Sequence, residues 1–110
     1  MSIPPKNLFQ DIPSHLPEEM VEVISESNNV RIERIVSKGD SSPDGFWYDQ
    51  EKNEFVILLK GRAKLLFEGE PETVTMKPGD YIEIKAHVKH RVDWTDPKKE
   101  TVWLAIHYSD

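Results

Sequence analysis

Residues 45–61, GFWYDQEKNEFVILLKG, combine three consecutive aromatic residues, several carboxylates and the longest apolar run of the chain. The apolar run, residues 55–59, ends close to a glycine, as a buried β-strand typically does. The carboxylates Asp49 and Glu54 lie between the aromatic residues and this run. Either they belong to a solvated turn or they enter the interior that the run builds. This choice decides whether the protein has a reactive site.

Short segments of strand character continue on both sides of this stretch. Residues 30–37 are rich in β-branched side chains, and residues 62–68 alternate apolar and polar side chains. The complete set of expected strands is 30–37, 55–60, 62–68, 73–76, 81–86, 90–94 and 101–108. Turn residues separate these segments, so the sequence predicts an all-β fold, an antiparallel sandwich or small barrel.

The N-terminal part has a different pattern. Residues 13–29, PSHLPEEMVEVISESNN, predict one short amphipathic helix with an N-cap serine and acidic residues in its first turn. The apolar residues at helical spacing are Met20, Val21 and Ile24. We therefore expect an arm and helix over residues 1–29 that pack on a barrel of residues 30–110.

Composition restricts the class of protein. The chain has 110 residues, of which 37% are hydrophobic and 31% charged, as expected for one soluble domain. Its net charge of −6 argues against nucleic-acid binding, and it has no cysteine for a disulfide or thiolate site. Its N-terminus lacks the pattern of a secretory signal, and no apolar run reaches the roughly 20 residues of a membrane span. The expected location is cytoplasmic.

Two segments resemble the sequence motifs of the cupin superfamily, whose members are small jelly-roll barrels. The first motif, G(X)5HXH(X)3-4E(X)6G, keeps its second half in Glu54 and Gly61. The second motif, G(X)5PXG(X)2H(X)3N, keeps Gly79 and His90. Its other positions differ: they are Lys85 for proline, His87 for glycine and Trp94 for asparagine. The resemblance covers roughly residues 30–108 and implies an antiparallel jelly-roll (cupin) barrel.

The resemblance also implies a divalent metal, since cupins bind one through the motif histidines and the glutamate. Glu54 and His90 carry over directly. The two histidine positions of the first motif fall on Trp47 and Asp49, or on Tyr48 and Gln50, depending on whether four or three residues precede the glutamate. The predicted metal ligands are Asp49, Glu54, His87 and His90, for iron, manganese, nickel or zinc. The predicted function is then a small cupin that holds a metal and a small-molecule ligand in its barrel.

Two alternatives remain open at this point. In the first, Glu54 and His90 are a metal-free acid–base pair of an isomerase or epimerase that acts on a sugar or carbonyl compound. Trp47, Trp94 and His107 would then contribute binding surface for the ligand. In the second, the protein is a non-catalytic ligand-binding or scaffold barrel. Pairing of exposed strands makes a homodimer the expected assembly.

Overall fold

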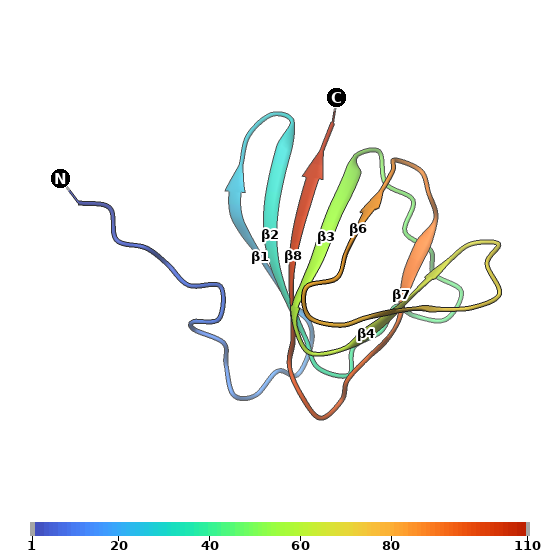
Figure 1. The fold of residues 1–110 in the computed structure, drawn as a ribbon, viewed down its shortest axis with the longest axis horizontal. Coiled ribbons are helices and arrows are strands. Elements are labelled where there is room, and N and C mark those ends of the chain that lie inside the picture. Colours follow the sequence, from blue (N-terminus) through green and yellow to red (C-terminus); the bar gives the residue numbers. More distant parts are fainter. Residues whose placement is uncertain (1, 110) are drawn as a thin grey trace.

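The computed structural model describes residues 2–109, which form two antiparallel β-sheets that face each other (Figure 1). The first sheet has five strands, in the order β1 (Met20–Glu26), β2 (Val30–Ser37), β8 (Thr101–Tyr108), β3 (Asn53–Lys60) and β6 (Tyr81–Ile84). The second has three, in the order β5 (Val74–Met76), β4 (Ala63–Phe67) and β7 (His90–Thr95). The all-β prediction is confirmed. The predicted arm and helix begin at Met1 and the predicted barrel ends at Asp110, and these two residues lie outside the described residues.

The predicted N-terminal helix is wrong. Residues 20–26 instead form β1, which pairs antiparallel with β2 and carries a register shift between Val23 and Ser25. The apolar residues at helical spacing are mostly β-branched, and they also fit a strand. Hydrogen bonds to β2 satisfy the backbone of this segment, so tertiary pairing overrides the local helical pattern. No part of residues 2–109 is a helix that could span a membrane.

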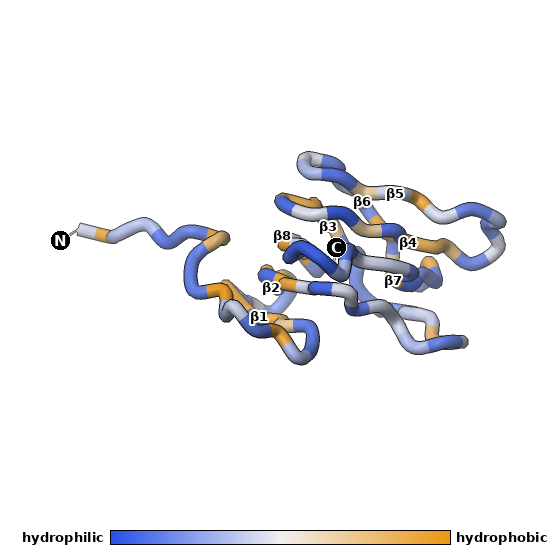
Figure 2. The backbone as a smooth tube through the Cα atoms, turned by 90° about the horizontal axis from the view of Figure 1, so that it is seen from below, coloured by the Kyte–Doolittle hydropathy of each residue, from blue (hydrophilic) through white to orange (hydrophobic). Residues whose placement is uncertain are grey.

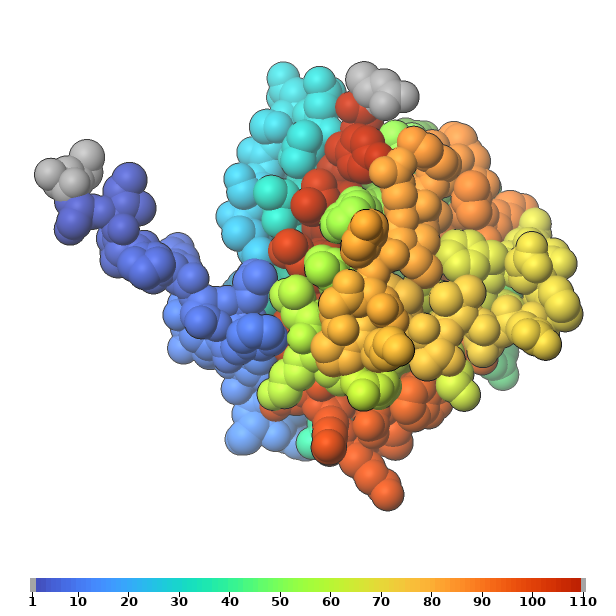
Figure 3. All heavy atoms as spheres, in the orientation of Figure 1, coloured from blue at the N-terminus to red at the C-terminus, as the bar shows by residue number. Residues whose placement is uncertain are grey.

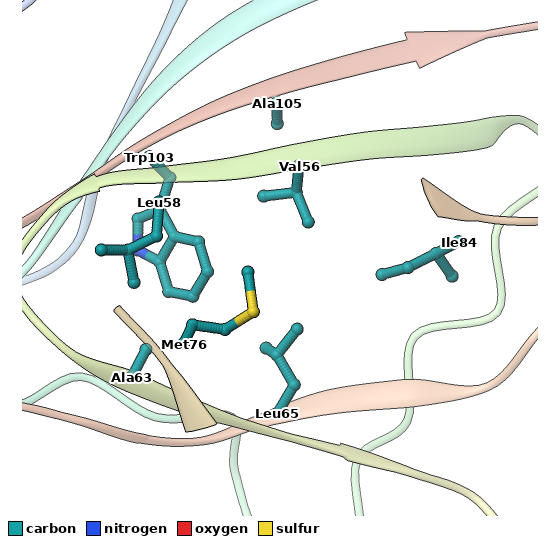
Figure 4. Close-up of a cluster of buried hydrophobic side chains, with 8 residues drawn as sticks. All are labelled: Val56, Leu58, Ala63, Leu65, Met76, Ile84, Trp103 and Ala105. Atoms are coloured by element: carbon teal, nitrogen blue, oxygen red, sulfur yellow. The ribbon is translucent and has the colours of Figure 1, made fainter. Parts of the chain in front are cut away.

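The hydrophobic core fills the space between the sheets (Figure 4). Val56, Leu58 and Trp103 project into it from the five-stranded sheet, and Leu65 and Met76 project from the three-stranded sheet. Leu58 is completely buried and Met76 nearly so. The run of residues 55–59 therefore builds the core with its alternate side chains.

Gly61 closes the tight connection between β3 and β4. Its φ is +94°, in the left-handed region, and a Cβ atom there would stand 2.4 Å from Thr101 Oγ1. A side chain at this position would also meet the Glu100 carbonyl oxygen at 2.6 Å. Only glycine fits here, so a steric requirement explains why the first motif has a glycine at this position.

Residues 2–19 are here called the N-terminal arm: its first part projects away from the sheets, and the rest returns along the edge of the five-stranded sheet before β1 begins (Figures 2 and 3). Arg34, which is only 4% exposed, fixes the middle of the arm. Its Nη1 donates to the carbonyl oxygens of Leu8 and Gln10, and its Nη2 lies 3.1 Å from Glu22 Oε1. One buried guanidinium thus ties the arm to the edge of the sheet.

The outer face of the five-stranded sheet is also apolar. Strand pairing places Ile32, Ile106 and Phe55 side by side in one row. In the next row, Leu104 lies beside Ile57. These five side chains are partly exposed, and we call them the outer apolar face. A two-layer sandwich normally exposes polar residues on this side, so the face is unusual for an isolated sheet.

Candidate functional site

A cavity of about 260 Å³ lies between the two sheets, next to the core. Apolar side chains, among them Val56, Leu65, Ile84 and Trp103, line one part of it. Its carboxylates are Glu19, Glu33 and Glu54, and its other polar groups are Arg31, Tyr48, Gln50, His90 and His107. An apolar wall with a few convergent polar groups is the usual form of a small-molecule site.

Three of the polar side chains form one row across the five-stranded sheet. His107 of β8 lies directly opposite Arg31 of β2 on one side and opposite Glu54 of β3 on the other. Directly opposed residues have Cβ atoms about 4.5–5.5 Å apart, so these side chains are immediate neighbours. The row is a consequence of strand register, which brings together residues far apart in the sequence.

His90 reaches the same cavity from the other sheet. Its Nε2 lies 3.6 Å from Glu54 Oε1, and its Nδ1 lies 2.9 Å from the Val88 carbonyl oxygen. A carbonyl can only accept, so Nδ1 carries a proton and donates it. His90 and Glu54 are 5% and 8% exposed, and the pair is thus a buried histidine–carboxylate contact.

The contact with Glu54 changes the proton affinity of His90. Burial by itself lowers the pKa of His90, because it disfavours the charged ring. The close approach of Glu54, the bond to Val88 and the Glu54 charge together outweigh burial. They hold the pKa of His90 above its usual value of 6.5. The contact with Glu54 therefore favours the protonated, charged form of the His90 ring.

The two first-motif positions inside the cavity are Tyr48 and Gln50, as three-residue spacing to Glu54 requires. Tyr48 exchanges two backbone hydrogen bonds with His90, and their rings stack with centroids 5.4 Å apart. Burial, followed by the charges of Glu19 and Glu54, raises the pKa of the Tyr48 phenol above 10.0. Tyr48 is therefore a neutral phenol at neutral pH.

Asp49 and His87 are not brought to the cavity. Their side chains are 43% and 66% exposed, and His87 Nδ1 lies 2.8 Å from Asp49 Oδ1 at the surface. Asp49 faces outward because Tyr48 and Gln50, on either side of it, face inward. His87 occupies the second-motif glycine position and adopts φ of +65°, a left-handed conformation that turns its side chain into solvent. Their expected meeting with Glu54 and His90 does not occur.

The predicted aromatic binding surface is also arranged differently. Trp94 is 37% exposed and lies under the Lys64 ammonium, which is 5.6 Å from its ring. Trp47 is partly buried but does not line the cavity. Of the three side chains expected to bind the ligand, only His107 lines it, and Trp103 is the tryptophan that does.

Three charged lining residues escaped the sequence analysis, and two of them, Arg31 and Glu33, lie on β2. Glu33 accepts from His107 Nε2 at 3.0 Å through one oxygen and from Arg31 Nε at 3.0 Å through the other. Arg31, Glu33 and Ile35 alternate along β2, which is the signal that could have placed them on one face. The intervening residue Arg34 is also charged, so charge by itself did not distinguish the two faces of this strand.

Glu19 is the third missed residue. It comes from the end of the N-terminal arm, and its Oε2 accepts a 2.7 Å hydrogen bond from Ser37 Oγ. Burial raises the pKa of Glu19 above 4.5, the bond from Ser37 opposes this shift, and the Asp40 charge adds to it. The wrong prediction of a helix over this segment concealed its position beside the cavity.

The donor set does not fit a divalent-metal centre as it stands. Tyr48 and Gln50 replace the two motif histidines, and the lining histidine His107 already donates from Nε2 to Glu33. Within residues 2–109, no three His, Asp or Glu side chains are grouped closely enough to hold one ion.

The fold, the glycine at the first turn and a cavity between two antiparallel sheets define the class of protein. The family model described as "Cupin domain" matches residues 33–107, and the chain belongs to this family. It is similar to a provisionally assigned mannose-6-phosphate isomerase from Ralstonia eutropha JMP134, with 42% identity and a TM-score of 0.94. The match covers 98% of this chain and 100% of that one.

More distant solved structures share the fold alone. A cupin superfamily protein from Desulfitobacterium hafniense DCB-2 has 18% identity and a TM-score of 0.73, covering 90% of this chain and 84% of that one. An RmlC-like cupin from Methanocaldococcus jannaschii, with a double-stranded β-helix fold, has 19% identity and a TM-score of 0.69. That match covers 89% of this chain and 86% of the other. A comparison with curated proteins gave no match.

Proposed function

We propose that this cupin binds a small sugar or carbonyl compound in its cavity and isomerises or epimerises it by metal-free acid–base catalysis. The observation that carries the proposal is the buried pair of His90 Nε2 and Glu54 Oε1, 3.6 Å apart in the cavity. A protonated histidine beside a carboxylate provides an acid and a base in the same site.

The pair suits proton transfer beside a carbonyl group. With the proton on His90, Glu54 is a carboxylate that can accept the proton from the carbon next to the carbonyl. His90 donates its Nε2 proton to the carbonyl oxygen, which gains negative charge as the C–H bond breaks. Return of the proton from Glu54 to the neighbouring carbon, with loss of the proton of the adjacent hydroxyl group, gives the isomer with no net change in electrons. Return to the same carbon, after the intermediate has turned its opposite face to Glu54, gives the epimer. The phenol of Tyr48 stacks on His90 and limits its access to water.

The relative from Ralstonia eutropha supports this reaction class, because its name is that of a sugar-phosphate isomerase and it is 42% identical over nearly the whole chain. The cavity of about 260 Å³ is small, which favours a compact ligand.

Solvent deuterium exchange with a small set of carbonyl compounds tests the proposal. The protein is incubated in D2O with D-mannose 6-phosphate and with small hydroxyaldehydes, and loss of the proton next to the carbonyl is followed by NMR. We expect protein-dependent exchange that falls on the order of 100-fold in Glu54→Gln. Glu51→Gln, a change in the exposed turn, is the matched control and should exchange at the wild-type rate. Exchange no faster than in buffer would overturn the proposal.

The metal-binding alternative has a separate readout. Zinc or manganese is titrated into the protein while the His90 ring resonances are followed by NMR. Acid–base catalysis without a metal predicts exchange that survives treatment with a chelator. Stoichiometric metal in the purified protein, together with chelator-sensitive exchange that zinc or manganese restores, would favour the metal-dependent cupin instead.

A scaffold or binding barrel that pairs with a second copy is a further candidate, favoured by the outer apolar face. The face is bounded on one side by the Arg34–Glu22 pair and on the other by the Lys85–Glu83 pair. The Lys85–Glu83 edge is exposed and carries both signs of charge, so a copy related by a two-fold axis that sets these edges side by side would find opposite charges there.

Light scattering after gel filtration tests this assembly. A dimer is expected for the wild type, and Ile57→Glu at the centre of the outer apolar face should make the protein a monomer. Val74→Glu, an exposed position on the three-stranded sheet, is the matched control and should leave the dimer intact. A monomeric wild type would overturn the pairing without affecting the exchange experiment.

A further inference from the structure

The cavity contains a second buried histidine–carboxylate pair, His107 and Glu33, in addition to His90 and Glu54. His107 Nε2 lies 3.0 Å from Glu33 Oε1, and Glu33 Oε2 lies 3.0 Å from Arg31 Nε. The His107 and Glu33 side chains are 7% and 12% exposed. Arg31 and Glu33 lie on β2 and His107 lies on β8, where it is directly opposite Glu54 of β3.

This chain of contacts fixes the tautomer of His107. Arg31 can only donate, so it holds Glu33 as a carboxylate that accepts at both oxygens. The nitrogen of His107 that faces Glu33 must then carry a proton, which makes Nε2 the N–H of the ring. In the neutral ring, Nδ1 is left with the lone pair and can act as a base.

His90 is held in the opposite tautomer. Its Nδ1 donates to the Val88 carbonyl oxygen, so the nitrogen that faces Glu54 is Nε2. The two cavity histidines are therefore oriented by different partners, one by a backbone carbonyl and one by a carboxylate. Glu54 lies between them, opposite His107 in the sheet and in contact with His90.

We infer that His107 is a second proton-transfer residue of this site, and that the substrate is an α-hydroxy carbonyl compound such as an open-chain sugar. The inference rests on the proposed function and deepens it. His90 donates a proton to the carbonyl oxygen. Glu54 removes a proton from the carbon that bears the hydroxyl group, and His107 accepts the proton of that hydroxyl group. Glu33 and Arg31 are positioning residues that act through His107.

The proton transfers balance. Glu54 removes the proton from the hydroxyl-bearing carbon while His90 protonates the carbonyl oxygen, which gives an enediol. The hydroxyl proton then passes to His107 Nδ1 as Glu54 returns its proton to the former carbonyl carbon. An aldehyde becomes a ketone, or the reverse, with no oxidant or reductant. Solvent carries the proton gained by His107 back to His90.

The experiment uses D-glyceraldehyde and D-mannose 6-phosphate in D2O and measures two rates by NMR. One is deuterium exchange at the hydroxyl-bearing carbon, which needs Glu54 and His90. The other is conversion to the ketone, which also needs His107. His107→Gln keeps an N–H donor toward Glu33 and lacks the Nδ1 base. We expect it to retain exchange and to lose conversion on the order of 100-fold. His87→Gln, at the exposed surface, is the matched control and should retain both rates.

Each outcome separates this inference from the proposed function. Conversion that survives in His107→Gln, or equal loss of both rates, would overturn the role of His107 and leave Glu54-dependent exchange standing. Wild-type protein without exchange on either compound would overturn the proposed function itself. Independently, ¹⁵N NMR of the imidazoles should detect the Nε2–H tautomer for His107 and a mixture of tautomers in Glu33→Gln. An Nδ1–H tautomer in the wild type would contradict the positioning by Glu33 and Arg31.

Discussion

Glu54 of β3 and His90 of β7 belong to different sheets, yet Glu54 Oε1 and His90 Nε2 lie 3.6 Å apart in the interior. Their contact depends on how the sheets face each other, not on either strand alone. The acid–base pair of the cavity therefore forms only when the two sheets pack against each other. The same contact makes the protonation of His90 a direct measure of whether the site is assembled.

The protonation of His90 should affect the stability of the fold. The pKa of folded His90 lies above its ordinary 6.5, so the pair contributes stability that is fully present below that pH. This contribution is lost as the pH rises through the folded-state pKa. An NMR titration of the His90 ring should give a midpoint above 6.5.

Urea unfolding across the same pH range provides the control. The wild type should lose stability above pH 6.5 relative to His90→Gln, whose side chain does not titrate. His15→Gln, an exposed change in the N-terminal arm, should keep the wild-type dependence. A His90 midpoint below 6.5 would contradict the contact with Glu54.

Glu19 should confer a pH dependence of the same direction as His90, because both pKa values are raised in the folded state. Its pKa is raised from 4.5 mainly by burial, so its ionisation at neutral pH opposes folding. Glu19→Gln keeps an acceptor for Ser37 Oγ and removes the charge. We expect a higher Tm than wild type at pH 7, and a difference that disappears as the pH falls below 4.5. Equal melting temperatures at pH 7 would contradict the burial of this carboxylate.

A comparison of Gly61→Ala with Gly69→Ala distinguishes the cost of steric conflict from the cost of backbone strain. A left-handed φ costs an ordinary residue about 1–3 kcal/mol, and forced overpacking adds about 1–3 kcal/mol. Gly69 is the control, since its φ is +88° but a Cβ there meets nothing within 4 Å. Gly61→Ala should therefore lower the free energy of unfolding clearly more than Gly69→Ala. Equal losses in denaturant titrations would mean that Thr101 can move aside.

Arg34→Met should release the N-terminal arm while it preserves most of the side-chain volume. Loss of its bonds to Leu8, Gln10 and Glu22 should lower the free energy of unfolding by about 2 kcal/mol. Trypsin should then cut after Lys6 faster than in the wild type. Arg62→Met is the control, because Arg62 is exposed and, among residues 2–109, its guanidinium donates only to the adjacent Gly61 carbonyl. Unchanged cleavage at Lys6 would show that Arg34 does not hold the arm.

Most of the fold could be predicted from local pattern. Period-two alternation, β-branched runs and turn residues identified the strands from β2 to β8, because side chains on a strand alternate between core and surface whatever the tertiary context. The pattern of residues 20–26 was ambiguous, since its apolar residues suit a helix and a strand equally. Pairing with β2 decided between them, and such pairing depends on a partner at the other end of a turn.

The site divides in the same way. Glu54 and His90 could be recognised from the sequence because both stand at motif positions that the chain retains. The inward direction of Tyr48 and Gln50, and the outward direction of Asp49, depended on turn length, which the sequence left open. Glu33 and Arg31 were missed because β2 carries charged residues on both faces.

By itself, the sequence of this cupin determined the strands of residues 30–108, the glycine-closed turn and two of the polar residues of the cavity. Only the tertiary structure decided that β1 is a strand, that Asp49 and His87 meet at the surface, and that His107 stands between Arg31 and Glu54. The physical reason is that alternation is a local property of one strand. Register and the facing of two sheets are relations between strands, and these relations set which buried charges meet.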